Sequence, residues 1–183
     1  MRSLIALQDK LFAPLGSGDA FLAFAARFAF AASLALYFFN SGLTKLGEGI
    51  FGIFQPSLGA YAQIFPRAME AAGYDTEQLG IFHWAVVTGG TVAEFVLPLL
   101  LIIGLFTRLA AVGMIGFIVV QSLTDLVGHG AWDDPKVLGA WFDRIPDGII
   151  LDQRMFWVLA LSILIFKGAG WLSVDGFLKK SAD

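Results

Sequence analysis

Several charged side chains stand inside long apolar stretches of this sequence, where a charge is costly unless it is paired or solvated. Glu94 is the candidate catalytic group, because a carboxyl group held in an apolar setting can exchange a proton with a ligand. Arg27 and Arg108 are the candidates for holding negative charge. The candidate binding residues are together Arg27, Asn40, Lys45, Arg108, Lys167 and Asp175.

The composition excludes several classes of protein. Hydrophobic residues make up 57% of the chain and charged residues 15%, against roughly 45–50% and about 25% in ordinary globular domains. The mean hydropathy is +0.75. A net charge of −3 argues against a nucleic-acid binder, which needs a cationic surface. The absence of cysteine removes disulfides, thiol redox relays and thiolate metal sites.

We expect neither a metal site nor a haem. His83 and His129 are the two histidines, and both belong to the outer ends of apolar segments. His129 has acidic neighbours at Asp125 and Asp133, but no second histidine stands nearby in the sequence. A solvated loop therefore accounts for His129 better than a metal ligand does.

Four segments are long and apolar enough to cross a bilayer, which takes about 20 residues. They run from about residue 20 to 43, 82 to 106, 108 to 127 and 155 to 172. Because these segments are apolar on all faces, they differ from the core helices of a soluble protein. The sequence predicts an all-α fold, a four-transmembrane-helix bundle with short interfacial helices, as one domain over residues 1–183.

The connections between these segments differ in character. The first outer loop predicts a short helix from Ser57 to about Gly73, disturbed at Pro66. The second outer loop, from about residue 129 to 153, is acidic and aromatic. Before the first segment, leucines at helical spacing predict an interfacial helix: Leu4, Leu7, Leu11 and Leu15. The inner segments are short and dense in cations, so we expect both termini in the cytoplasm.

Counting depth along each span sorts the polar residues into two layers. The inner layer holds three cations and two anions, a balance of +1: Arg27, Arg108, Lys167, Asp175 and, deepest, Glu94. The outer layer holds Asn40, Lys45, Gln121, Asp125, His129, Asp152 and Arg154. One interpretation is that Arg27–Glu94 and Lys167–Asp175 are ion pairs that set the register of the helices. The other is a pocket whose positive charge receives a small anion, a quinone carbonyl or a lipid headgroup.

The order and spacing of five motifs resemble the DoxX/DoxD family of small integral membrane proteins. They are an early arginine at Arg27, the stretch Asn40-Ser-Gly-Leu-Thr-Lys45-Leu, Ala93-Glu94, the turn Gly104-Leu-Phe-Thr-Arg108, and the closing Gly168-Ala-Gly-Trp-Leu-Ser-Val-Asp175. The resemblance covers about residues 21 to 175. It implies a four-helix protein of bacterial inner membranes, and some members look like membrane subunits of thiosulfate:quinone oxidoreductase. Other members are linked to oxidative-stress complexes or to the maturation of periplasmic enzymes.

Two functions follow as hypotheses. The first is an accessory or subunit of a redox-linked membrane system, with a polar pocket inside the bundle; quinone is the cofactor that this would imply. The alternative is a non-enzymatic scaffold or assembly factor for a membrane or periplasmic protein, and homo-oligomers fit either hypothesis. A small-solute carrier ranks last, because four spans lack the paired inverted repeats that many carriers show. The sequence does not decide whether the chain is itself catalytic.

Overall fold

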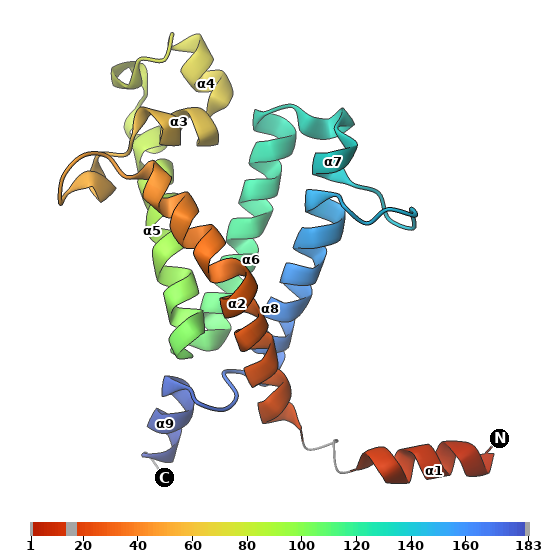
Figure 1. Cartoon of the computed structure of the whole chain (residues 1–183). Coiled ribbons are helices and arrows are strands. Elements are labelled where there is room, and N and C mark those ends of the chain that lie inside the picture. The colour runs from red at the N-terminus through yellow and green to blue at the C-terminus, as the bar shows by residue number, and fades with distance from the viewer. Residues whose placement is uncertain (1, 14–17, 182–183) are drawn as a thin grey trace.

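The structure is a computed structural model that describes residues 2–13 and 18–181. This part of the chain is helical and contains no strand. Four long helices form its body (Figure 1): α2 (Asp19–Lys45), α5 (Ile81–Ile103), α6 (Thr107–Leu123) and α8 (Met155–Lys167). The prediction of an all-α, four-span bundle is confirmed, since these helices, two of them extended by a π-helical turn, are long and apolar enough to cross a membrane.

Two of the spans are longer than their α-helices because a π-helical turn continues each at one end. The turn Thr124–Gly128 extends α6, and the turn Ile149–Arg154 precedes α8. The third span is therefore Thr107–Gly128 and the fourth is Ile149–Lys167. The fourth span begins and ends earlier in the chain than the predicted range of about 155–172. The helix ends at Lys167 because Gly168 has φ of +82°, which breaks the helical path.

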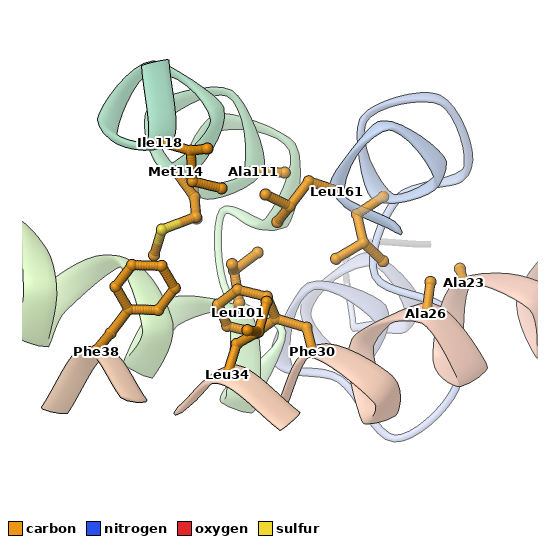
Figure 2. Packing of buried hydrophobic residues seen from close by; sticks show 12 residues of the cluster. Ala23, Ala26, Phe30, Leu34, Phe38, Leu101, Ala111, Met114, Ile118 and Leu161 are labelled. Atoms are coloured by element: carbon orange, nitrogen blue, oxygen red, sulfur yellow. The ribbon is translucent and has the colours of Figure 1, made fainter. Parts of the chain in front are cut away.

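The four long helices pack in a closed ring in which α2 contacts α5 and α8, and α6 contacts the same two neighbours. Figure 2 shows buried side chains of α2 facing those of the other three helices. Phe38 lies at the aromatic part of this core, where its ring meets Phe117 and Trp157. Because the core joins all four helices, the polar residues of different helices have fixed relative positions.

The two ends of the bundle differ (Figure 1). At one end, called here the turn end, a tight turn joins α5 to α6, and α1 (Arg2–Phe12) and α9 (Val174–Lys180) lie nearby. The opposite, loop end carries α3 (Leu58–Ile64), α4 (Pro66–Ala71) and α7 (Pro135–Leu138). Short 3-10 turns complete the loops at Gly52–Phe54, Thr76–Gln78 and Ala131–Asp133.

The local predictions for the loops hold. Ser57 caps α3 by accepting a hydrogen bond from the backbone amide of Ala60, and Pro66 begins α4 as a new helix. The expected N-terminal helix is α1, which runs across the direction of the bundle helices at the turn end (Figure 1). Leu15, the last leucine of the expected apolar strip, lies outside the described residues.

Candidate functional site

The centre of the candidate site is a buried ion pair between α2 and α5. The Nζ atom of Lys45 lies 3.0 Å from Oε1 of Glu94, and these side chains are only 5% and 3% exposed. Ser41, one turn before Lys45 on α2, donates a hydrogen bond of 2.9 Å to the same Oε1 atom. Lys45 also donates to the hydroxyl oxygen of Ser41 at 2.7 Å. The three side chains thus form one polar cluster in an apolar bundle.

This pairing corrects the expected Arg27–Glu94 ion pair and the placement of Glu94 in the inner layer. Side chains on a helix lean toward its N-terminus, which for α2 is at the turn end. Lys45 at the end of α2 therefore reaches back into the bundle toward Glu94, whereas Arg27 reaches away from it. Arg27 contacts Gly104, and Glu94 lies about 15 Å from Gly104 along α5.

A cleft of about 520 Å³ opens beside this cluster, between α5 and α6 with the end of α2 and α3 around it. That volume is within the range of small-molecule sites, about 300–1,000 Å³. Apolar side chains form much of the wall, and three glycines, at positions 90, 113 and 116, leave room between the helices. Glu94 and Lys45 line the cleft on the side of α5 and α2. Gln121 of α6 and Asp125 of the π-helical turn after it line the cleft on the other side.

Two acceptor atoms on the wall of this cleft lack a hydrogen-bond partner among the described residues. They are Oε2 of Glu94 and Oε1 of Gln121. Glu94 is only 2% exposed, so its free oxygen is a buried acceptor that water reaches poorly. Leaving such an atom unpaired costs about 1–3 kcal/mol, and more for a charged group. A ligand with hydrogen-bond donors would relieve that cost.

A second cavity, of about 590 Å³, lies on the other side of Gln121 and Asp125, toward α8. Here Arg154, 4% exposed, pairs with Asp125 at 2.7 Å and donates to Ser122 at 2.8 Å. His129 contacts the backbone oxygen of Gln63 at 2.9 Å and so joins the end of α6 to α3. Lys45 with Glu94 and Arg154 with Asp125 are thus two ion pairs between different helices of the bundle.

Arg27 and Asp175 both lie at the turn end, where each hydrogen-bonds to backbone groups of another segment. Arg27 is 4% exposed and donates to the backbone oxygens of Trp171 and Leu172 at 2.7 and 2.6 Å. Asp175 accepts hydrogen bonds of 2.9 Å from the backbone amides of Phe106 and Thr107 and so caps α6. Three of the five sequence motifs, those at Arg27, Gly104–Arg108 and Gly168–Asp175, are therefore held together by hydrogen bonds at the turn end.

The surroundings of Asp175 also determine its acidity. Partial burial would raise the pKa of this carboxyl group, but the hydrogen bonds from Thr107 and Phe106 and the charge of Lys179 outweigh that effect. The pKa of Asp175 is consequently held below its ordinary value, and the group is a carboxylate at neutral pH. Asp175 is thus a fixed negative charge and not a group that exchanges protons near pH 7.

The remaining predicted residues lie apart from the cleft. The expected Lys167–Asp175 pair was wrong: Lys167 pairs with Asp19 at 2.7 Å, since Asp175 is held by the amides of α6. Arg108 is exposed and donates to the backbone oxygen of Phe166 at 3.3 Å. Asn40 is exposed and lines none of the three hollows described in this chain.

Sequence reasoning did not place Ser41 or Gln121 in the candidate site. Ser41 precedes Lys45 by four residues, which puts both on one face of a helix, and that spacing was the available signal. Gln121 was assigned to the outer layer, but nothing in its neighbourhood along the chain indicates that it faces Glu94 across a cleft. The position of Gln121 opposite Glu94 depends on how α5 and α6 diverge from the turn that joins them.

Comparison with known proteins gives a match to one protein family. The family model described as DoxX matches residues 22–125, more than half of the chain. This stretch runs from α2 to the start of the π-helical turn after α6, and it contains Arg27, Asn40, Lys45, Glu94 and Arg108. No curated protein and no solved structure matches the chain significantly.

Proposed function

The chain belongs to the DoxX family, and from this premise we propose that it is an accessory or subunit of a redox-linked membrane system. In this proposal the cleft between α5 and α6 binds a small molecule of the quinone class. The observation that carries the proposal is the buried carboxyl group of Glu94, with one oxygen paired to Lys45 and the other without a partner on the cleft wall.

The residues of the cleft suit such a molecule. A quinone supplies two-electron, two-proton chemistry within the bilayer. The apolar wall would exclude water from the ring, and the free oxygens of Glu94 and Gln121 would accept hydrogen bonds from the hydroxyl groups of the reduced form. Lys45 holds the paired oxygen of Glu94 in place. Glu94 is then the group that would hold or release a proton at its Oε2 atom.

The first test is native mass spectrometry of the protein extracted gently from its own membrane. We expect a retained small molecule in the wild type and its loss in Glu94→Gln, whereas Glu70→Gln, at an exposed position of α4, should retain it. A titration with decylubiquinol should give a Kd at least tenfold weaker for Glu94→Gln, because a hydrogen bond to a charged acceptor contributes about 1.5–3 kcal/mol. Gln121→Met removes the other free acceptor without touching the ion pair.

Equal affinities for the wild type, Glu94→Gln and Gln121→Met would overturn this proposal. Thermal unfolding of each variant shows whether it is folded. If Glu94→Gln fails to fold, Gln121→Met carries the test alone, since Gln121 is partly exposed and takes no part in the ion pair.

The alternative is a scaffold or assembly factor for a membrane or periplasmic protein, or for a second copy of this chain. The exposed aromatic residues of the loop between α6 and α8 favour it: Trp132 is 55% exposed, Trp141 60% and Phe142 fully exposed. Aromatic residues of this kind are enriched in protein interfaces. Under this alternative the mass spectrum shows a stoichiometric protein partner and an empty cleft, and Trp141→Ser abolishes the complex whereas Glu94→Gln does not.

The same proposal includes the location and orientation. We place the protein in the inner membrane with both termini in the cytoplasm, because the turn end carries Arg108 and Lys167 at the ends of spans and Lys179 and Lys180 on α9. Cytoplasmic segments near span ends are enriched in such cations.

A further inference from the structure

A third hollow, of about 510 Å³, lies at the turn end and is separate from the cleft of the proposed function. It is formed by the start of α2, the start of α6, the end of α8 and α9. Three of these elements each contribute one cation, namely Arg108 from α6, Lys167 from α8 and Lys179 from α9. Segments far apart in the sequence therefore bring three positive charges to one hollow.

The acidic residues of this hollow are already engaged. Asp19 pairs with Lys167 at 2.7 Å, and both carboxylate oxygens of Asp175 accept hydrogen bonds from backbone amides of the α5–α6 turn. Within residues 2–13 and 18–181, neither Arg108 nor Lys179 has a carboxylate oxygen within 4 Å, although the charge of Lys179 also acts on Asp175. Three cations and two carboxylates leave a balance of +1, located at Arg108 and Lys179. An anion would therefore be attracted to that side of the hollow.

Exposed apolar side chains lie in and beside the same hollow. Phe106 and Leu109 line it and are 62% and 72% exposed, and Phe166, next to Lys167, is 78% exposed. Leu109 and Phe166 belong to membrane-spanning helices, so in a bilayer these exposed side chains face lipid. A small soluble anion would use the cations alone. A molecule with an anionic head and an apolar tail would use both the cations and the apolar surface.

We propose that this hollow binds the phosphate headgroup of an acidic membrane lipid. Arg108 and Lys179 contact the phosphate, while Lys167 stays paired with Asp19. The acyl chains lie along Leu109 and Phe166. Basic pockets at the ends of membrane-spanning helices are suited to such headgroups. The site does not depend on the function of the cleft, because none of its residues lines the cleft.

The test places the purified protein in phosphatidylcholine bicelles with increasing phosphatidylglycerol and counts the bound lipids by native mass spectrometry. We expect the wild type to retain phosphatidylglycerol in preference to phosphatidylcholine. The double variant Arg108→Gln/Lys179→Gln should lose about 25-fold of that preference, about fivefold for each cation. The matched control is Lys136→Gln/Arg144→Gln, which removes two exposed cations at the loop end and should behave as the wild type.

Three outcomes would overturn the proposal. The first is an unchanged lipid preference in the double variant, and the second is an equal loss in the loop-end control, which would indicate general surface charge. The third is binding of glycerol 3-phosphate as tightly as phosphatidylglycerol, which would indicate a site for a free anion. If the double variant does not fold, Lys179→Gln on short, exposed α9 tests the same contact, with about a fivefold loss expected.

Discussion

The ion pair between Lys45 and Glu94 makes the strongest prediction about stability. Replacing Lys45 with Met keeps the length of the side chain but leaves Glu94, 2% exposed, with no cation beside it. Removing one partner of a buried ion pair costs about 3–5 kcal/mol. Ser41 still donates a hydrogen bond to Oε1 of Glu94 in this variant. We therefore expect the free energy of unfolding to fall by an amount at the lower end of that range, about 3 kcal/mol.

The double variant Lys45→Met/Glu94→Leu should recover most of this loss. Replacing both partners of a buried pair with apolar residues of similar size is often neutral or stabilising, because the cost of burying two charges disappears. We therefore expect the free energy of unfolding of the double variant to lie within about 1 kcal/mol of the wild-type value. The coupling between the two residues is the loss in the double variant minus the summed losses of Lys45→Met alone and Glu94→Leu alone.

The assay is unfolding in bicelles by titration with sodium dodecyl sulfate, followed by tryptophan fluorescence. Lys136→Met is the control, because Lys136 lies exposed in the loop-end segment and should change stability by less than about 0.5 kcal/mol. A Lys45→Met variant as stable as this control would refute the reasoning, and so would a double variant as unstable as the sum of the two single changes. A stable double variant that no longer binds the ligand would assign the pair to function.

Two further predictions concern the turn end. Asp175→Asn should cost about 1–2 kcal/mol through the loss of the charged cap on α6. The pKa of Asp175 is lowered in the fold, so the stability that its charge contributes is complete above about pH 4 and is lost as the pH falls through the lowered value. The difference in thermal stability between the variant and the wild type should therefore shrink in acid. Gly104→Ala should lower the thermal unfolding temperature strongly, because φ is +69° there and the added methyl group would overlap the Arg27 guanidinium. Gly89→Ala, where no atom lies within 4 Å of the added methyl group, is its control and should melt at or above the wild-type temperature; equal losses in the two glycine variants would contradict this account.

The sequence alone determined the architecture, because hydropathy over a membrane-length window and helix-capping chemistry are local properties. The four spans, the cap at Ser57 and the helix break at Pro66 were all visible in the order of residues. The motifs around Lys45 and Glu94 also identified the family that the matching model supports. For the same reason the sequence showed that Glu94 lies within a span, although it did not show which cation accompanies it.

The tertiary structure decided which charges meet. Depth counted along separate straight helices put Arg27 beside Glu94, whereas α2 crosses its neighbours obliquely in Figure 1 and its side chains lean toward the turn end. Lys45 therefore reaches Glu94, and Arg27 reaches the carbonyl groups before α9. Glu94 of the predicted inner layer thus pairs with Lys45 of the predicted outer layer, whereas Arg27 and Asp175 hold the chain at the turn end. Such pairings depend on helix tilt and side-chain direction, which are set by packing among all four helices and are not encoded in any one segment.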